Sequence, residues 1–412
     1  MSTTAASTFP NVIRRQHDGS LGVYLDVYKA LLQEQGYSRG ATYLHLRIVA
    51  DFSRWLRRQR LSAKDLDERT VKRYLRSRRR FVDRYRGASF VPYKFLGMLR
   101  ARGILKQSPR PVPDACEVAV AKFKQYLAQE RGLSVSTQRN YTRFAHQFLR
   151  ERFARDRLQL SRLSATAVTA FIQRHVHERS PRSAQHIVGS LRAFLRYLRY
   201  CGEITTDLAA CVPTVPNLSY SMLPRFLQPG QARKVLDHCD RRRTPGLRNY
   251  AILLLLARLG LRACEVVAMT LDDIDWRAGS LTVRGKGGQR AEMPLPGEVG
   301  RAIAIYLKKS RPRCASRRLF IRERAPRIGF ADSSAVSTLV ERALAAAGVD
   351  SPHTGAYVFR HSLATEMLRH GASLGEIGQL LRHAHPDTTQ IYAKVDVGAL
   401  RPLALQWPGG GR

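Results

Sequence analysis

Residues 380–395, LLRHAHPDTTQIYAKV, decide how the C-terminal part of the chain is interpreted. They continue a predicted helix, break at Pro386 and place Tyr392 nine residues after His383. A phenol has an ordinary pKa of about 10, so it becomes a nucleophile only where cations stabilise the phenolate and a positioned group takes its proton. An isolated tyrosine in such a helix is more often a half-buried packing residue. The reactivity of Tyr392 therefore depends on the cations that the rest of the chain supplies.

Two arginines upstream are the candidate cations. Arg360 lies in YVFRHSLATEM, near the start of a predicted helix, and Arg262 lies in ARLGLRACEVVAM, just after Gly260. Arg262 is flanked by apolar residues, where an unpaired charge is expensive, and Glu265 is a candidate partner that orients it. Two guanidinium groups neutralise the charge that builds on a phosphodiester under attack. Either arginine alone is more often a solvated or phosphate-tracking side chain.

A strand pair is predicted between these motifs. Residues 280–296, SLTVRGKGGQRAEMPLP, alternate apolar and polar side chains on either side of a glycine turn. Lys286 lies at the tip, where an ammonium group can reach into a groove and protonate a leaving oxygen, although an exposed turn lysine is the simpler interpretation. Helices are predicted over 336–347, 357–370 and 374–381.

The chain is predicted to contain three folded blocks. Two proline-containing segments, 108–114 and 212–229, have the composition of linkers, and apolar residues at helical spacing predict that the first two blocks are helical. The predicted divisions are a flexible tail at 1–20, a helical module at 21–107, a second helical domain at 115–211, a mixed block at 227–398 and a C-terminal tail at 399–412.

The two helical blocks also resemble each other. At a fixed offset LLQEQGYS, residues 31–38, lies over LAQERGLS, residues 127–134, and FLGMLRARG, residues 95–103, lies over FLRYLRYCG, residues 194–202. A duplicated module explains this match, and the composition that all amphipathic helices share is the competing explanation.

The charge balance predicts a polyanionic partner. The 412 residues include 70 Lys and Arg against 32 Asp and Glu, which gives a formal net charge of +38. Nucleic acid is the expected partner, because each phosphate neutralised by Lys or Arg releases condensed counterions. Arg139 and Arg143 of the second block are candidate DNA contacts. The stretch 76–86, RSRRRFVDRYR, also suits a phosphate backbone, although a solvated helix face explains it about as well.

Several other classes of protein are disfavoured. The longest strongly apolar run, 251–257, is too short to cross a bilayer, and residues 1–20 lack the apolar stretch of a secretory signal. The six cysteines include no CxxC pair, so neither a metal site nor a disulfide framework is expected. We expect a cytoplasmic protein associated with the bacterial nucleoid, with no membrane partner.

The ordered motifs GLRACE, RGKGG, RHSLATEML and LLRHAHPDTTQIY resemble those of the tyrosine recombinase (phage integrase) family, over about residues 227–395. The second block resembles the core-binding domain of that family. The resemblance implies a mainly α fold with a small β-sheet, in which helical SAM-like core-binding modules accompany a mixed α+β catalytic domain.

The resemblance also implies a role for each candidate residue. Arg262 and Arg360 would clamp the scissile phosphate, and Lys286 would be the general acid for the departing 5′ oxygen. His383 would hold the phosphate or assist proton transfer, and Tyr392 would form a covalent 3′-phosphotyrosyl link. Because this link keeps the energy of the broken bond, neither ATP nor a metal ion nor any other cofactor is implied.

The implied partners are double-stranded DNA and further copies of the chain, or related recombinases, in a tetramer that acts on two sites. The repeated module favours an origin in a mobile element. Two competing functions stay open: a type IB topoisomerase-like relaxing enzyme, and a DNA-binding regulator that does not cleave.

Two positions depart from the pattern of the family. Tyr357 stands where the family usually has a histidine, three residues before Arg360, and a tyrosine donates a hydrogen bond to phosphate but is a poor base near neutral pH. Arg382 stands where a glycine commonly precedes the histidine, and we predict that it contacts the DNA backbone. Tyr357 is the reason for keeping the regulator as an alternative.

Overall fold

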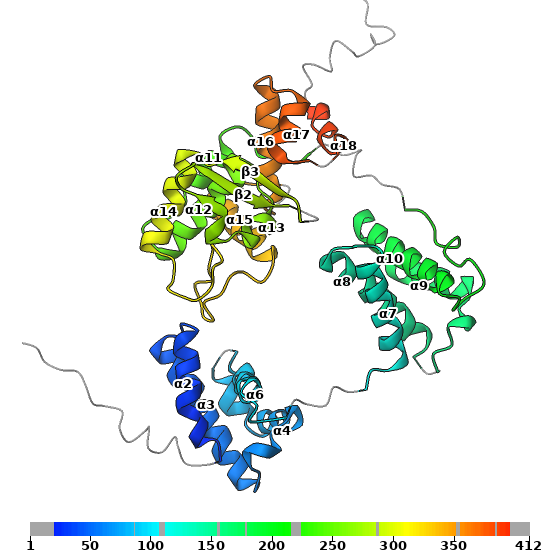
Figure 1. Ribbon diagram of the computed structural model, residues 1–412, viewed down its shortest axis with the longest axis vertical. Helices are drawn as coiled ribbons and strands as arrows, with labels where there is room; N and C mark the ends of the chain where they lie inside the picture. The colour runs from blue at the N-terminus through cyan, green and yellow to red at the C-terminus, as the bar shows by residue number, and fades with distance from the viewer. Residues whose placement is uncertain are drawn as a thin grey trace, which may run out of the picture. The chain divides into compact units, whose positions relative to one another are not determined.

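The predicted fold class is confirmed by the computed structural model, which is 62% helix with one three-stranded sheet among its described residues (Figure 1). Those residues are 20–85, 87–106, 112–154, 157–177, 179–215, 224–285, 288–351, 355–383 and 385–395. Both predicted tails lie outside them almost entirely, as do parts of the two predicted linkers.

The N-terminal block is helical around an aromatic core. Phe52, Tyr74 and Phe95 are completely buried there, because they lie on the inward faces of amphipathic helices. The elements of this block are η1 (Gly22–Tyr24), α2 (Leu25–Glu34), α3 (Arg39–Arg58), η2 (Ala63–Asp65), α4 (Glu68–Ser77), α5 (Arg79–Asp83), η3 (Ala88–Phe90) and α6 (Val91–Ala101).

The central block is also helical and has a core of its own. Phe123, Phe171 and Phe194 are buried at its centre. Its elements are α7 (Ala115–Gln129), α8 (Val135–Arg152), η4 (Leu160–Arg162), α9 (Ala165–Val176) and α10 (Pro181–Tyr200).

The same local structure occurs where the two helical blocks align. Gly36 follows α2 and Gly132 follows α7, and both have a positive φ, at +77° and +57° respectively. Two residues later Ser38 caps α3 by accepting from the backbone N–H of residue 41, and Ser134 caps α8 by accepting from that of residue 137. This agreement favours the proposed duplication.

The C-terminal block combines helices with the sheet. Strand β2 (Ser280–Arg284) pairs in antiparallel fashion with β1 (Ile274–Asp275) and with β3 (Arg290–Pro294), in the order β1-β2-β3. The predicted strand pair is confirmed as β2 and β3. Strand β1 was not predicted, because two residues are too few to show the alternation of apolar and polar side chains. The helices are α11 (Gln231–Asp237), α12 (Thr244–Leu259), α13 (Ala263–Ala268), α14 (Gly297–Lys309), α15 (Ser334–Ala346), α16 (Tyr357–Arg369), α17 (Leu374–Leu381) and α18 (Asp387–Gln390), with η6 (Leu271–Asp273) and η8 (Ala393–Val395). The three helices predicted from the sequence correspond to α15, α16 and α17.

The core of the C-terminal block is centred on α12. The stretch of this helix from Ala251 to Leu256 is apolar on all sides and fully buried, and α14 and α16 pack against the helix. A smaller, separate cluster forms around Ile377, Leu381 and Tyr392, and it holds α17 and α18 against α16. The two clusters differ greatly in size.

The described residues divide into two compact units. The N-terminal and C-terminal blocks belong to one unit, and the central block belongs to the other. No helix in the described ranges has the length and apolar character needed to span a membrane.

Candidate active site

Arg360 is the most deeply buried of the candidate residues. It lies in the first turn of α16 and is 1% exposed, and its guanidinium donates from Nη1 to the carbonyl of Gly260 (2.6 Å) and from Nη2 to the carbonyl of Leu381. Gly260 has φ +57°, a backbone conformation that favours glycine, and a Cβ there would lie 2.7 Å from the end of the Leu381 side chain. Burial and the charge of Arg262 lower the pKa of Arg360 to about 10, which leaves it protonated at neutral pH.

Arg262 is held by the carboxylate predicted for it. It is the N-cap residue of α13, its backbone N–H donates to Oε2 of Glu265 (2.8 Å), and its Nη1 donates to Oε1 (2.7 Å). Glu265 is 3% exposed, whereas the side chain of Arg262 remains 28% exposed. The guanidinium is therefore oriented by a buried anion and still reaches the surface.

Arg382 is directed inward, which differs from the predicted contact with the DNA backbone. Its side chain is 14% exposed, and Nη2 donates to Oε2 of Glu265 (2.9 Å). Burial lowers the pKa of Arg382, and the charge of Glu265 opposes this shift. The sequence did not reveal this contact, because 117 residues separate the two partners.

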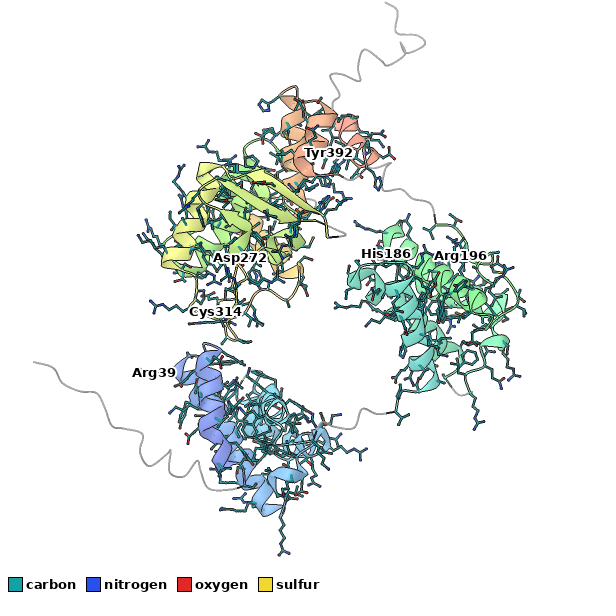
Figure 2. All side chains as sticks on the ribbon, in the orientation of Figure 1. Arg39, His186, Arg196, Asp272, Cys314 and Tyr392 are labelled. Carbon is teal, nitrogen blue, oxygen red and sulfur yellow. The ribbon has the colours of Figure 1, made fainter. Side chains whose placement is uncertain are left out.

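Tyr392 follows α18 and is 1% exposed, among the side chains of the C-terminal helices (Figure 2). Its Oη forms a hydrogen bond with Nδ1 of His361 at 3.0 Å. Burial raises the pKa of the phenol, whereas the nearby charges of Arg360 and Arg262 act to lower it. The phenol therefore lies within the field of both guanidinium groups and is protonated in this state.

His361 is a site residue that the sequence reasoning passed over. It directly follows Arg360 on α16, but successive side chains leave a helix about 100° apart, so the two reach different groups. The contact with Tyr392 spans 31 residues, and no periodic pattern reports such a distance. The only available signal was an imidazole adjacent to a candidate arginine.

His383 faces the same cluster but does not bond to the phenol. Its Nδ1 forms a hydrogen bond with Oγ1 of Thr389 at 2.7 Å, and its ring is nearly parallel to that of Tyr392, with 6.5 Å between centroids. Burial, together with the charges of Arg360 and Arg262, lowers the pKa of His383 to about 4. The imidazole is therefore neutral at pH 7 and can act as a proton acceptor.

Tyr357 lies at the exposed edge of this cluster. It is the first residue of α16, is 49% exposed, and its ring meets that of His361 edge-on at 4.7 Å. The rings of Tyr357 and Tyr392 therefore both contact the imidazole of His361.

The remaining predicted residues lie elsewhere. Lys286 falls outside the described residues; in the same hairpin the N–H of Gly285 donates to the carbonyl of Gln289 (2.7 Å). Arg139 and Arg143 are exposed and lie one turn apart on α8, in the central unit.

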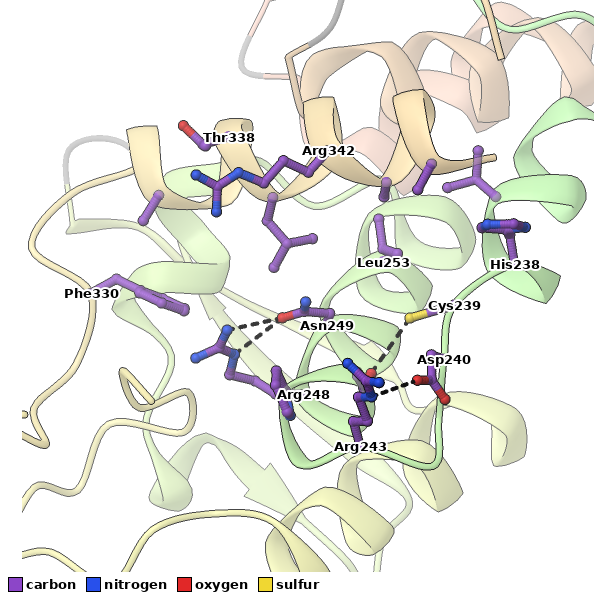
Figure 3. Close-up of a pocket in the computed structure, with 17 residues that line it drawn as sticks. His238, Cys239, Asp240, Arg243, Arg248, Asn249, Leu253, Phe330, Thr338 and Arg342 are labelled. Carbon is purple, nitrogen blue, oxygen red and sulfur yellow. Dashed lines mark hydrogen bonds and ion pairs between the residues drawn. The ribbon is translucent and has the colours of Figure 1, made fainter. Parts of the chain in front are cut away.

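One pocket of the described chain lies away from this cluster. It has a volume of about 670 Å³, lies among α11, α12 and α15, and is bordered by Arg243, Arg248 and Arg342 (Figure 3). None of the candidate catalytic residues lines it. A large ligand such as a nucleic acid binds across a surface, so pocket size does not locate its site.

The cluster can bind an anion and supply a nucleophile. Two guanidinium groups and two imidazoles surround one phenol, and the described residues contain no group of three or more His, Cys, Asp or Glu side chains placed to hold a metal ion. Such a set suits attack on a phosphodiester, because the cations neutralise its oxygens while the phenol attacks phosphorus.

Comparisons with known proteins give one consistent result. The model of the phage integrase family matches residues 225–398. The y4rA protein of Sinorhizobium fredii, named as an integrase/recombinase, is 43% identical over 400 residues, which cover 96% of this chain and 97% of the relative. The tyrosine recombinase XerD of Listeria innocua is 30% identical over 297 residues, covering 69% and 96% respectively.

Two solved structures share the fold. One is the XerH site-specific recombinase bound to a palindromic difH substrate, with a TM-score of 0.55 and 18% identity, covering 82% of this chain and 94% of that one. The other is a lambda integrase dimer bound to a core site, with a TM-score of 0.51 and 18% identity, covering 67% and 94%.

Proposed function

The chain belongs to the phage integrase family and is a tyrosine recombinase; we propose that it cleaves and rejoins double-stranded DNA through a covalent 3′-phosphotyrosyl intermediate. The observation that carries this proposal is the position of Tyr392. Its phenol is hydrogen-bonded to His361 and lies within the field of Arg360 and Arg262.

In the proposed reaction the oxygen of Tyr392 attacks phosphorus and displaces the 5′ oxygen of the next nucleotide. The phenolic proton passes to an imidazole, for which His361 is the group in contact. Arg262 and Arg360 neutralise the nonbridging oxygens, and Lys286 protonates the departing oxygen. Attack of a 5′ hydroxyl on the phosphotyrosine reverses these steps.

Neither ATP nor a metal ion is required by this scheme. The phosphotyrosyl ester replaces the phosphodiester, so the bond energy is kept for rejoining. The charge that a metal ion supplies in other phosphoryl transfers is supplied here by the two arginines.

The site requires a change of position before it can react. Tyr392 is 1% exposed, and a phosphodiester in duplex DNA cannot reach a buried phenol. We propose that binding of DNA displaces the turn after α18 and brings the phenol to the phosphate. His383 and Tyr357, the latter 49% exposed, would then contact phosphate oxygens.

We also propose a function for each of the three blocks. Residues 227–398 form the catalytic domain, residues 115–211 the core-binding domain that contacts DNA through Arg139 and Arg143, and residues 21–107 a further DNA-binding module. Each block has its own hydrophobic core. The active assembly is a tetramer on two DNA sites, and the tails at 1–20 and 399–412 remain outside these domains.

The basic stretch 76–86 is the proposed DNA surface of the first module. Arg76, Arg80 and Arg84 are exposed around a hollow of about 530 Å³ at the junction of α4 and α5. A set of guanidinium groups at this spacing suits a phosphate backbone.

The decisive test uses nicked suicide duplexes made from the DNA that flanks the gene. We expect the wild-type chain to form a covalent protein–DNA adduct, and we expect Tyr392→Phe to bind the same DNA without forming any. Tyr250→Phe, which alters a tyrosine of α12 outside the cluster, is the matched control and should form adduct normally.

The same experiment separates the competing functions. A normal yield of adduct from Tyr392→Phe would refute the assignment of the nucleophile. Specific binding without adduct from the wild-type chain would identify a regulator that does not cleave, and relaxation of supercoiled plasmid that lacks any such site would identify a topoisomerase-like enzyme.

A further inference from the structure

The backbone of Arg382 adopts a conformation that favours glycine. The residue ends α17 with φ +55° and ψ +51°, in the left-handed region, where a Cβ crowds the following carbonyl. In the described chain only one other non-glycine residue, Arg60, has a positive φ. A large side chain that persists in such a conformation is held there by contacts that offset its strain.

The side chain of Arg382 provides such a contact. Its Nη2 donates to Oε2 of Glu265 at 2.9 Å, and the carboxylate is almost completely buried, with 1% of its side chain exposed. The same carboxylate accepts from Nη1 of Arg262 through Oε1 and from the backbone N–H of Arg262 through Oε2. One buried anion therefore lies between two guanidinium groups.

The combined charge of Arg262, Glu265 and Arg382 affects how strongly Arg262 can attract the phosphate. If Glu265 faced Arg262 alone, the pair would be neutral, and the carboxylate would compete with the phosphate for the guanidinium. With Arg382 present the three side chains carry a net charge of +1. Glu265 can then orient Arg262 while most of the positive charge of Arg262 stays available to the phosphate.

Arg382 also joins two parts of the site. It directly precedes His383, and Glu265 lies on α13, so the ion pair ties the turn that carries His383 to the helix that presents Arg262. The ends of this contact are 117 residues apart in the sequence.

We infer that Arg382 is a positioning residue for strand cleavage: it neutralises Glu265 so that this carboxylate orients Arg262 without cancelling its charge, and it holds the turn of His383 against α13. This inference rests on the proposed function. It assigns Arg382 no contact with DNA.

The test compares Arg382→Met, Arg382→Lys and Arg382→Gly in the full-length protein. We measure the single-turnover rate of adduct formation at saturating nicked DNA, and the Kd for the same DNA by fluorescence anisotropy. We expect Met to lower the rate by about 10- to 100-fold with little change in Kd, because a displaced catalytic group costs up to about two orders of magnitude. Lys should restore part of the rate, because it returns the charge without the planar fork.

Arg382→Gly separates charge from backbone conformation. Glycine suits the left-handed turn better than arginine, yet we expect a rate as low as that of Met, because the countercharge is missing. Arg369→Met, which removes an exposed charge at the end of α16, is the matched control and should cleave normally.

A double variant tests whether Arg382 acts through Glu265. Adding Glu265→Gln to Arg382→Met removes the uncompensated carboxylate, so the double variant should cleave faster than Arg382→Met alone, a non-additive result expected of residues in contact. Additive losses would overturn the inference.

Two other outcomes would also overturn it. If Arg382→Gly cleaves at the wild-type rate, Arg382 only occupies a turn. If the Arg382 variants bind DNA with a higher Kd and cleave at an unchanged rate, Arg382 contacts DNA directly. In both cases the wild-type chain still forms adduct, so the proposed function stands. Absence of adduct from the wild-type chain itself would overturn the proposed function together with the inference.

Discussion

Two parts of the candidate site are held in very different ways. The arginine clamp, formed by Arg262 and Arg360, is fixed to backbone carbonyls and to a buried carboxylate beside the large core around α12. The tyrosine segment, residues 387–395, consists of the four-residue helix α18, η8 and the two residues between them, and its buried apolar side chains belong to the small cluster around Leu381. A helix of one turn is not stable by itself, so this segment depends on that small cluster.

This difference shows which catalytic groups are preorganised and which must move before the reaction. Charges that stabilise a transition state act best when they need no rearrangement, and the arginine clamp meets that condition. The nucleophile must leave a buried position before it meets DNA, and a lightly held segment can do so at low cost. Three experiments test this comparison.

The largest effect is expected from Arg360→Met, which breaks the arginine clamp. The carbonyls of Gly260 and Leu381 would lose their buried donor, at a cost of about 1–3 kcal/mol for each unsatisfied group, and cleavage should fall by about 100- to 1,000-fold. Urea unfolding and adduct formation measure the two effects. Arg258→Met, which removes an exposed ion pair with Glu298, should change both only slightly. Equal behaviour of the two variants would contradict a preorganised clamp.

A smaller and local effect is expected from His361→Phe, which keeps an aromatic ring at this position and removes the hydrogen bond to Tyr392. The loss of one buried hydrogen bond costs about 1 kcal/mol, so the tyrosine segment should open several times more often. Amide hydrogen exchange should accelerate across 387–395 and remain unchanged in α12. Unchanged protection of the segment would show that this bond does not hold it in place.

The effect that is smallest at neutral pH, and that grows only in acid, concerns His383. Its pKa is about 4 in the folded chain and about 6.5 in an unfolded one, so folding opposes protonation of this imidazole. The free energy of unfolding should therefore be unaffected by His383 above pH 6.5 and should decrease as the pH falls from 6.5 towards 4. His383→Gln should reduce this decrease in urea unfolding at pH 4.5 relative to pH 7.5. His370→Gln, at an exposed position, is the control; a decrease that both variants leave unchanged would exclude His383 as its source.

The fold was predictable where it depends on local pattern. The alternation in 280–296 predicted the strand pair β2–β3, and helical spacing predicted α15, α16 and α17. The alignment of the two helical blocks places Gly36 over Gly132, and the structure shows that both have a positive φ. The two-residue strand β1 was not predictable, because its only support is its partner β2.

The site was predictable in its residue types but not in its contacts. Order and spacing of motifs singled out Arg262, Arg360, His383 and Tyr392, and the structure places all four in one charged cluster. The partner of the phenol is His361, which the sequence did not single out. The direction of Arg382 was also unforeseen, because its exposure depends on a carboxylate far away in the chain.

The sequence by itself therefore determined the class of fold, the basic character of the chain and the groups able to carry the chemistry, since these follow from residue type and short-range periodicity. Only the tertiary structure decided which imidazole bonds to the phenol, which carboxylate lies between two arginines, and that the nucleophile is buried. These properties arise from contacts between residues 31 and 117 positions apart, where the packing of whole helices, and not the local pattern, sets the distance between two side chains.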